Sequence, residues 1–483
     1  MNIAEWGLII LVVLAPRLTM IWIGGQQISG DSFLYMGVAR NIAENFCVSL
    51  SDPSGGVCAP HWGGNQLPGY PAFMAAVWWV SGGEFKFVPP AQSLVFAVAA
   101  AVLAAALRRA GAEANAVRLV VLVLAVSPSL VGWPRMLLTE TLSAAAAIWL
   151  LAELVKSVAE RRPRIVPTAI AMAIGIFIRY DFVLMLLPVG LTMLYILPVF
   201  QALRSLIAVL LICALPIVGW AARAAAVGLP PVPPYGLTPH GEELPPGIFK
   251  WIGVWLVYQH DLRESVWALV NYDYNDFHPP LSAYRSESER RVVEGHIATL
   301  SKNFLGVSPP TEIDNDFAKL ARARIETEPV RYWLVLPVRR ALAMWLAPTP
   351  SMGWPVEVGD QKRREWRRAL EHQDWMEVAD LIVENSGAVL AKGLVVLHRY
   401  ILLLSGLIMM FSLISCWRRG QNNLTMSLAG LALVLALGRT FAFSQTLLVE
   451  TRYLVPCLAW LDVAVTIQIH ALWRHKRTIN IAA

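Results

Sequence analysis

The sequence predicts an all-α polytopic membrane protein, a bundle of about ten transmembrane helices with interfacial helices and an insert outside the membrane. Composition is the first reason: 56% of the 483 residues are hydrophobic and 15% are charged, whereas a soluble domain carries about 25% charged residues. The second reason is the mean hydropathy of +0.53. The third is the recurrence of apolar runs, many of which reach the roughly 20 residues that cross a bilayer as a helix.

The length of each apolar run decides whether it is predicted to cross the bilayer. The predicted spans are residues 5–24, 90–107, 116–133, 137–155, 165–178, 182–200, 204–222, 392–416, 424–443 and 453–472. The first run is followed by no small-residue cleavage site, so we expect it to be retained. Residues 72–80 follow a Pro-rich turn and are too short to span, which predicts a half-inserted or interfacial helix.

Positive residues are concentrated in alternate connections between these runs. They are Arg108, Arg109, Arg118, Lys156, Arg161, Arg162, Arg164, Arg204, Arg418, Arg419, Arg474, Lys476 and Arg477. Basic loops face the cytoplasm, so both termini are predicted to be cytoplasmic. The net charge of +6 therefore reflects the basic connections between membrane spans and does not indicate a nucleic-acid partner.

The charge pattern also divides the chain into three parts. Residues 1–222 are predicted to form a transmembrane core with a large first outer loop at 25–89. Residues 223–391 form an extracytoplasmic insert, which begins with a stiff Pro-rich exit and carries an amphipathic interfacial helix near 331–347. Residues 392–483 supply the C-terminal transmembrane helices and a basic cytoplasmic tail.

The five cysteines have no metal-ligand spacing. Cys213, Cys416 and Cys457 fall in apolar runs and are predicted to be buried. Cys47 and Cys58 share one polar loop. On an oxidising face of the membrane they form a disulfide, and otherwise they are free thiols; the sequence leaves both open.

One carboxylate is singled out by its place, Asp31, which follows the first apolar run by a few residues. If Ser29 caps a helix here, Asp31 lies in the first turn, where the helix dipole favours a negative charge. An ionised carboxylate at the edge of a bilayer is suited to accept a proton from a hydroxyl. The alternative is an aspartate that only complements the helix dipole.

Two more charged positions lie on the same predicted face. Glu140, just inside an apolar run, is either a site residue or an interfacial partner of Arg135. Arg179 is either a ligand for substrate or half of a local ion pair with Asp181 in a tight turn. His61, in the first outer loop, could contact a sugar or a metal, although a lone loop histidine usually does neither.

The best candidate for binding an anion is Arg452, which lies between Glu450 and Tyr453 before the last span. An arginine can hold a phosphate through two parallel hydrogen bonds and stays charged when partly desolvated. The alternative is an arginine that extends to the membrane interface.

Four short motifs lie in a set order on the predicted outer face. They are Asp31-x-x-x-Tyr35, Leu67-Pro68-Gly69-Tyr70-Pro71, Thr139-Glu140-Thr141-Leu142 and Glu450-Thr451-Arg452-Tyr453-Leu454-Val455-Pro456. This order resembles the GT-C superfamily of membrane glycosyltransferases, and most of all the branch of protein mannosyltransferases, aminoarabinose transferases and related bacterial lipid-linked-sugar transferases. The resemblance covers residues 1–222 and about 392–470, and not the insert between them.

The resemblance implies a GT-C-like helical core, a first outer loop with interfacial helices and a polyprenyl-phosphate sugar as donor. It implies that Asp31 is the catalytic base. Expected substrate-binding residues are Tyr35, His61, Glu140, Arg179, Glu450, Arg452 and Tyr453. Many relatives carry a second acid directly after the aspartate, and this chain has Ser32 there. That departure puts in doubt any role of a neighbouring acid, including metal binding. No cofactor is expected; a divalent metal stays open, without support from the sequence.

The expected function is inverting glycosyl transfer at the outer face of a bacterial inner membrane, toward the periplasm or exterior. The acceptor is a hydroxyl or amine on an envelope glycan, a lipid or a protein; membrane lipids, and not nucleic acid, are the other partners. Two classes compete: a flippase or transporter of lipid-linked saccharides, and a polysaccharide polymerase or ligase. One-sided polar groups and the lack of repeat symmetry argue against transport, and the early Asp31 loop favours the transferase over the polymerase.

Overall fold

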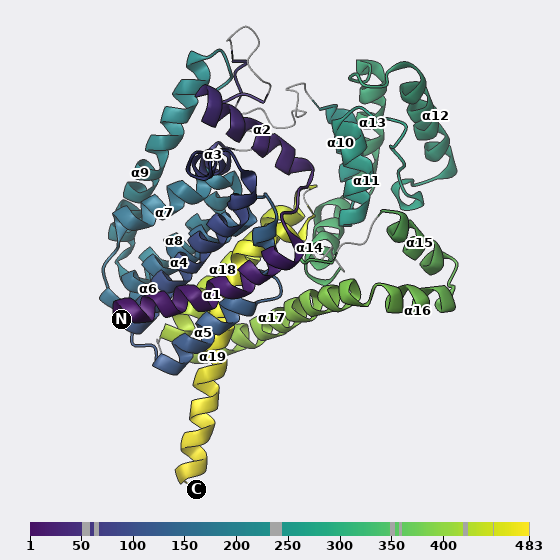
Figure 1. Ribbon diagram of the computed structural model, residues 1–483. Coiled ribbons are helices and arrows are strands. Elements are labelled where there is room, and N and C mark those ends of the chain that lie inside the picture. The colour runs from purple at the N-terminus through teal and green to yellow at the C-terminus, as the bar shows by residue number, and fades with distance from the viewer. Residues whose placement is uncertain are drawn as a thin grey trace. The chain divides into compact units, whose positions relative to one another are not determined.

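The structure is a computed structural model that describes residues 1–50, 58–61, 67–231, 244–347, 353–356, 360–418, 424–447 and 449–482. Throughout these ranges the regular structure is helical, and no strand is formed (Figure 1). The chain divides into two compact units. Unit 1 is Met1–Pro231, Pro348–Ala436 and Val455–Ala483, and unit 2 is Val232–Ala347 and Leu437–Leu454. The boundaries of these units are not those of the three parts expected: residues 223–231 and 348–391 belong to unit 1, and residues 437–454 belong to unit 2.

Unit 1 contains most of the long apolar helices. Its helices are α1 (Ile3–Gly24), α2 (Gly30–Asn45), α3 (Gly69–Ser81), α4 (Val88–Arg109), α5 (Ala114–Val126), α6 (Glu140–Glu160), α7 (Ile165–Ile178), α8 (Leu186–Ile196), α9 (Val199–Ala226), α15 (Asp360–Glu371), α16 (Trp375–Glu384), α17 (Ser386–Arg418) and α19 (Val455–Ala482), with short turns η1 (Phe85–Phe87), η2 (Trp133–Arg135) and η3 (Tyr180–Met185). Helix α18 (Leu424–Ser444) has its last residues in unit 2.

Seven helices in the described part of the chain are long and apolar enough to cross a membrane. They are Ile3–Gly24, Phe85–Arg109, Glu140–Glu160, Val199–Ala226, Ser386–Ser415, Leu424–Ser444 and Thr451–Arg474. The other three predicted spans correspond to shorter apolar helices, Ala114–Val126, Ile165–Ile178 and Tyr180–Ile196. A polytopic, all-helical membrane protein is therefore confirmed, and the count of ten spans stays a prediction.

The core of unit 1 is built on small side chains. Helices α4 and α6 pack along buried alanines, among them Ala100 and Ala104 on α4 and Ala144 and Ala147 on α6. Small residues let helix backbones approach closely where no water drives the association. Trp460 of α19 donates from Nε1 to the Ala147 carbonyl over 2.8 Å, so the last helix is tied to the same core.

A buried arginine joins the first span to this core. Arg17 of α1 has no exposed surface. It donates to the carbonyls of Leu124 and Ala125 at 2.8 and 3.1 Å, which are among the last residues of α5, and its guanidinium lies 4.0 Å from the centre of the Phe96 ring. The guanidinium of Arg17 thereby donates to two carbonyls at the end of α5. The last carbonyls of a helix have no backbone N–H partner within it.

The connections of unit 1 are sorted between its two ends. At one end Glu153, near the end of α6, pairs with Lys156 and Arg164 at 2.7 Å each, and Arg474 of α19 pairs with Glu113 before α5. Helix α6 begins at the other end, at Glu140. The basic connections and the predicted site residues of unit 1 therefore lie at opposite ends, as the charge pattern predicts.

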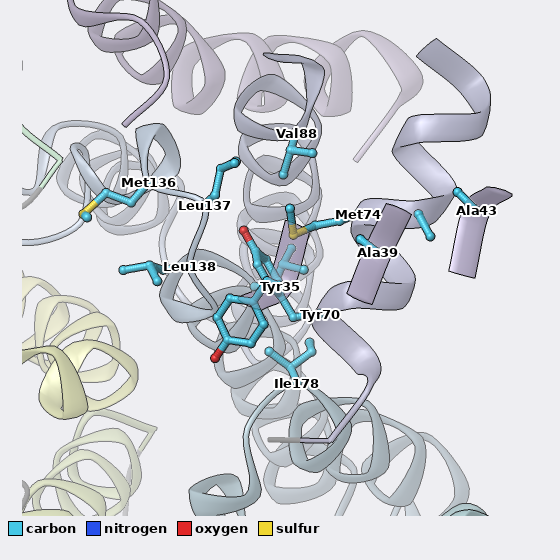
Figure 2. Packing of buried hydrophobic residues seen from close by; sticks show 12 residues of the cluster. Tyr35, Ala39, Ala43, Tyr70, Met74, Val88, Met136, Leu137, Leu138 and Ile178 are labelled. Atoms are coloured by element: carbon cyan, nitrogen blue, oxygen red, sulfur yellow. The ribbon is translucent and has the colours of Figure 1, made fainter. Parts of the chain in front are cut away.

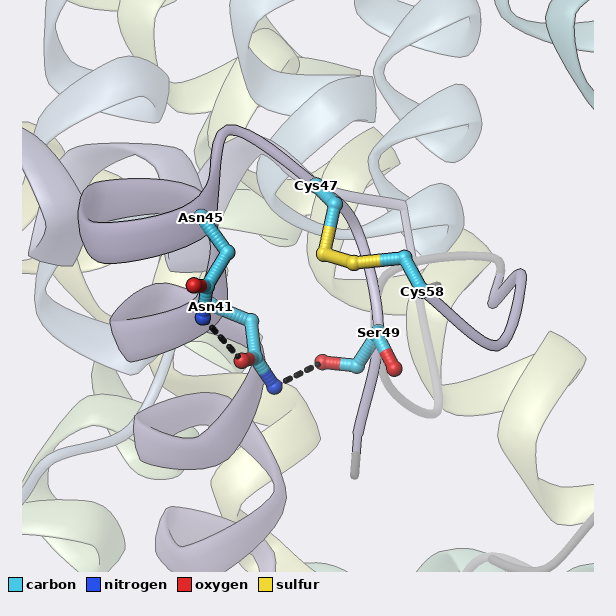
Figure 3. The surroundings of a disulfide bond; sticks show 5 residues. All are labelled: Asn41, Asn45, Cys47, Ser49 and Cys58. Carbon is cyan, nitrogen blue, oxygen red and sulfur yellow. Dashed lines mark hydrogen bonds between the residues drawn. A yellow bond between two sulfur atoms is a disulfide. The ribbon is translucent and has the colours of Figure 1, made fainter. Parts of the chain in front are cut away.

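The first loop contains a disulfide between Cys47 and Cys58 (Figure 3). Beside it, Asn41 of α2 donates to the Ser49 carbonyl at 3.1 Å and accepts from Asn45 at 3.0 Å. The bridge decides between the two possibilities that the sequence left open. Disulfides persist in oxidising compartments, and the position of this loop on the outer face stays a prediction.

Two of the other cysteines, Cys213 and Cys457, are buried, as predicted. The side chain of Cys416 lies outside the described residues.

Unit 2 is a small helical body. Its elements are α10 (Pro246–Gly253), α11 (Gln259–Val270), η4 (Leu281–Ala283), α12 (Glu287–Asn303), α13 (Thr311–Thr327), η5 (Arg331–Val335), α14 (Leu336–Leu346) and η6 (Thr451–Leu454). A buried ion pair between Arg324 and Glu289, at 2.6 Å, joins α13 to α12, and Trp251 of α10 donates to the same carboxylate at 3.0 Å. The predicted interfacial helix near 331–347 is thus a helix, formed by η5 and α14.

Candidate functional site

The predicted site residues fall into two groups, one in each unit. Unit 1 holds Asp31, Tyr35, His61, Glu140 and Arg179, and unit 2 holds Glu450, Arg452 and Tyr453. The two groups are therefore described separately.

Asp31 is the second residue of α2, whose N-cap is Ser29, as predicted. The carboxylate is partly exposed. Ser32, where many of the resembled transferases have a second acid, is fully buried, and its Oγ accepts the Ser29 backbone N–H at 3.0 Å. The residue that replaces the acid therefore closes the first turn of the helix that carries Asp31.

The start of α2 lies beside the start of α6. Gln27, shortly before α2, forms a single bridge to Met136, shortly before α6. The Gln27 N–H donates to the Arg135 carbonyl at 2.8 Å, and the Leu137 N–H donates to the Gln27 carbonyl at 3.3 Å. Asp31 and Glu140 each follow this bridge by four residues, so the backbone brings both carboxylates to one end of unit 1.

Two tyrosines connect α2 with α3. Tyr35, one turn after Asp31, packs edge-on against Tyr70 of α3, with ring centres 5.1 Å apart. Figure 2 shows both rings within a buried cluster that also holds Met74, Leu138 and Ile178. Burial, then the charge of Glu140 and then Tyr35, raise the pKa of Tyr70 well above its ordinary value. Tyr70 therefore keeps its proton and acts as a hydrogen-bond donor.

Tyr70 is a site residue that sequence reasoning missed, although it lies in the Leu67–Pro71 motif. Its hydroxyl donates to Gln92 Oε1 at 3.3 Å. The Gln92 amide in turn donates to the carbonyls of Pro134 and Met136 at 2.6 and 2.8 Å. A fully buried glutamine thus holds α3, α4 and the segment before α6 together.

A buried charged cluster lies where α6 begins and α7 ends. Arg179 donates from Nη1 to Glu140 Oε1 at 3.0 Å and to Thr139 Oγ1 at 2.8 Å. Its Nε donates to Asp181 Oδ1 at 3.0 Å. All four side chains are less than a tenth exposed. The positive end of the α6 dipole also favours the Glu140 carboxylate.

Two of the predicted alternatives can be compared with this geometry. The local ion pair of Arg179 with Asp181 is present, and the same arginine also holds Glu140. The expected alternative partner of Glu140, Arg135, donates to the carbonyls of Gly25 and Gly353 at 2.9 and 3.1 Å. Because Nη1 and Nε of Arg179 donate to these carboxylates, a phosphate bound by the same arginine would compete with them for its N–H groups.

An apolar cavity of about 970 Å³ lies in unit 1. It is lined by residues of α3, α4, α6, α7 and α9, and two of them, Leu142 and Ile178, are close in the chain to Glu140 and Arg179. The remaining lining residues are Gly69, Phe73, Val95, Val98, Ala99, Val102, Ala145, Ala146, Trp149, Ile170, Ala173, Ile174, Phe177, Ile212, Leu215 and Pro216. Such a lining suits an apolar chain and offers nothing to the hydroxyls of a sugar.

His61 is held by the end of α9. Its carbonyl accepts from Arg223 Nη1 at 2.8 Å, and its N–H donates to the Val48 carbonyl at 3.0 Å. Burial, and then the charge of Arg223, lower the pKa of His61 below its ordinary value. The imidazole is therefore neutral at pH 7 and can accept a hydrogen bond.

In unit 2, Arg452 is paired with Glu450. Its Nε lies 2.9 Å from Glu450 Oε2, and its Nη2 donates to Oε1 at 3.2 Å. Glu450 also accepts from Gln259 at 3.2 Å. The guanidinium lies 5.5 Å from the centre of the Tyr453 ring, which stacks on Phe443. The arginine expected to bind an anion thus has a carboxylate partner and an aromatic support.

Sequence reasoning also missed a buried chain of three polar residues in unit 1. Ser129 Oγ lies 2.8 Å from His398 Nδ1, and His398 Nε2 lies 2.8 Å from Asp462 Oδ1. A serine-hydrolase triad has the ring nitrogens in the opposite order. Ser129 is only 6% exposed. The three hydrogen-bonded residues therefore link the turn after α5 to helices α17 and α19.

The described residues contain no group of three or more His, Cys, Asp or Glu side chains that could hold a metal ion. No protein-family model, no curated protein and no solved structure matches the chain. The resemblance to the GT-C superfamily therefore stays an expectation from the motifs.

Proposed function

We propose that this protein is an inverting glycosyltransferase that moves a sugar from a polyprenyl-phosphate donor to an acceptor hydroxyl or amine, with Asp31 as the general base. The reaction would take place at the outer face of a bacterial inner membrane. One observation carries the proposal: unit 1 contains a buried charged cluster and an apolar cavity, and the lining residues Leu142 and Ile178 are close in the chain to Glu140 and Arg179 of that cluster. A polyprenyl-phosphate sugar has the same two parts, a polar head and an apolar tail.

The cavity supports the tail of this donor. Helices α4, α6 and α9, which line it, are among those long enough to cross a membrane. An isoprenoid chain could therefore enter the cavity without leaving the apolar region of the bilayer. Apolar side chains line the whole cavity, so we expect the cavity to select the isoprenoid chain by its apolar character rather than by its length.

The charged cluster supports the head. Carboxylates such as Glu140 and Asp181 accept hydrogen bonds from sugar hydroxyls. Arg179 is the cation nearest to both carboxylates. When a phosphate approaches, the guanidinium can exchange a carboxylate oxygen for a phosphate oxygen in the same planar geometry.

The chemical step is an in-line displacement. The acceptor oxygen attacks the anomeric carbon while its proton passes to the Asp31 carboxylate. The bond from the anomeric carbon to the phosphate oxygen breaks, and its electron pair leaves with the lipid phosphate. That leaving group is already stable, so no general acid is required. Arg179 would stabilise the charge on the departing phosphate, and the configuration of the sugar would invert.

The test is Asp31→Asn in the purified protein, reconstituted with polyprenyl-phosphate hexoses and pentoses. The matched control is Glu44→Gln on the same helix. Glu44 is exposed, and its carboxylate accepts a hydrogen bond from Arg40 at the surface of that helix. We expect Asp31→Asn to lower turnover by at least about 100-fold, the scale of general-base catalysis, and Glu44→Gln to retain it. Unchanged turnover by folded Asp31→Asn protein would contradict the proposal.

The same assay separates the competing classes. A transferase releases one polyprenyl phosphate for each single sugar moved, and NMR of the product reports inversion. A flippase moves the intact lipid-linked saccharide without breaking this bond. A polymerase needs a lipid-linked oligosaccharide and lengthens it, so a monosaccharide donor would give no product.

A further inference from the structure

Helix α14 has an apolar face that the described residues of unit 2 leave exposed. Along η5 and α14, large apolar side chains recur every four residues and are exposed: Val330 is 66% exposed, Leu334 61%, Val338 49%, Leu342 51% and Leu346 37%. Residues four apart share one face of a helix. These five residues, named here the α14 stripe, therefore form one continuous apolar surface.

The opposite face of α14 is also apolar, and it is the face that packs. Leu336, Pro337, Ala343 and Met344 are buried. Arg340, also on this side, donates to the carbonyls of Leu256 and Gly253 at 2.9 and 2.6 Å, which are residues of unit 2 near α10. A helix on the surface of a soluble domain has polar residues on its exposed face. An apolar exposed face needs a partner.

The hydrogen bonds of α14 indicate which partner this is. Trp345 Nε1 donates to Thr440 Oγ1 at 2.9 Å, and Thr451 Oγ1 donates to the Met344 carbonyl at 3.2 Å. Thr440 is close to the end of the span Leu424–Ser444, and Thr451 is the first residue of the span Thr451–Arg474. The end of α14 is therefore tied to the point where the chain leaves one membrane span and begins the next.

We propose that η5 and α14 form an in-plane anchor whose apolar stripe is seated among the lipid acyl chains, just below the headgroups. The residues beside the stripe agree with this depth. Arg331 and Arg339 are exposed, and so is Trp333, at 65%. Arginine and tryptophan are the side chains that favour the boundary between headgroups and acyl chains. The partner of this surface is a lipid bilayer, and the anchor holds unit 2 against it.

The proposal is tested with single nitroxide labels on the full-length protein in lipid nanodiscs. Labels replace Leu334, Val338 and Leu342 in turn, after Cys213, Cys416 and Cys457 are changed to alanine and the loop disulfide is kept. Leu211, an exposed residue of the span Val199–Ala226, is the lipid control, and Glu326, an exposed residue of α13, is the water control. Collision with oxygen reports lipid, and collision with a water-soluble nickel chelate reports water.

We expect the three stripe labels to behave like the Leu211 label, with high oxygen and low nickel collision rates, and unlike the Glu326 label. Nickel collision rates equal to those at Glu326 would overturn the proposal. Low rates for both reagents, together with dipolar broadening, would mean that a second copy covers the stripe, and would overturn it too. Three positions are read independently, so one label that disturbs folding leaves the test decisive.

Discussion

The surroundings of Arg179 restrict how the buried charged cluster of unit 1 can bind an anion. Its side chain is held between the carboxylates of Glu140 and Asp181, away from water. Isolated charges are costly to bury, and a paired set is tolerated because each charge has a partner. A substrate that carries its own phosphate could take the place of one carboxylate. The cluster is therefore both a structural support for the ends of α6 and α7 and a position where an anion can exchange.

Replacing Arg179 with alanine should destabilise the protein strongly, because it leaves two carboxylates buried together. Breaking a buried ion pair typically costs about 3–5 kcal/mol. We expect a large fall in the thermal midpoint, measured in detergent. The matched control is Arg40→Ala, which removes an exposed pair with Glu44 and should cost about 1 kcal/mol or less. Equal effects of the two substitutions would contradict this view of the cluster.

His61 predicts a pH dependence. Its pKa is lowered in the folded protein, so on acidification the unfolded chain takes up the proton first. Stability should therefore be unaffected above the ordinary value of 6.5 and be lost as the pH falls below it. His61→Gln should reduce this acid-side loss, measured as the midpoint of thermal unfolding against pH. The exposed His372→Gln is the control and should leave the profile unchanged.

At the scale of elements, the site depends on how closely α3 approaches α7. Gly69, the first residue of α3, lies against the backbone at the end of α7. A side chain at this position would push α3 away from the cavity and move Tyr70 away from Gln92. The glycine of the Leu67–Pro71 motif thus has a physical explanation, close approach of two backbones, that needs no left-handed conformation.

Gly69→Ala tests this close approach. Its Cβ would lie 2.5 Å from the Phe177 carbonyl oxygen, and a backbone atom cannot turn aside as a side chain can. We expect a loss of about 1–3 kcal/mol, the usual cost of overpacking, measured by thermal unfolding. Gly7→Ala on α1, where no atom lies within 4 Å of the added Cβ, should be neutral. A neutral Gly69→Ala would show that the contact is looser than described.

The loop disulfide gives a second prediction at this scale. Cys47 and Cys58 should resist alkylation in isolated membranes until a reductant is added, as measured by the mass shift of a maleimide reagent. Cys58→Ser should lower stability by about 2–4 kcal/mol. Two thiols that react without reductant would contradict both the bridge and the oxidising position inferred for this loop.

For the whole molecule, the membrane arrangement follows from composition more reliably than the site does. The long apolar runs were predicted and are helices. The run at 116–133 was predicted as one span, and the helix ends at Val126. The reason is a turn in which the Ser127 carbonyl accepts from Leu130 and Val131. Ser127, Pro128 and Ser129 form this turn together with the apolar Leu130 and Val131. Because apolar residues stand on both sides of the three small residues, hydropathy over the whole run did not distinguish the turn from the helix.

Prediction of the site residues from the sequence is limited in the same way, to what local signals indicate. Asp31, with its cap at Ser29, follows from local signals, and the structure has that cap. Tyr70 and Gln92 became visible only in three dimensions, since their partners are distant in sequence. His398 and Asp462 are 64 residues apart, and Ser129 and His398 are 269 apart. Periodicity and local motifs contain no information about pairs at such separations.

The number of spans has a consequence that can be measured at the two ends of the chain. Ten spans place both termini on one side of the membrane, and seven place them on opposite sides. We expect both on the cytoplasmic side, as the basic loops predict. Fusions of a fluorescent protein, active only in the cytoplasm, and of alkaline phosphatase, active only outside, should agree at residues 1 and 483. Opposite results at the two ends would exclude an even number of spans.

The buried arginine of α1 has a consequence for how the protein is made. Arg17 lies inside the first span, and inserting an arginine at the centre of a lone helix costs about 2.5–3.5 kcal/mol on insertion scales. Its partners, the carbonyls of Leu124 and Ala125, are synthesised more than one hundred residues later. Until the ribosome has made α5, the first helix carries an unpaired charge in the lipid, so a chain that stops before residue 124 should leave α1 loosely inserted and open to quality-control proteases.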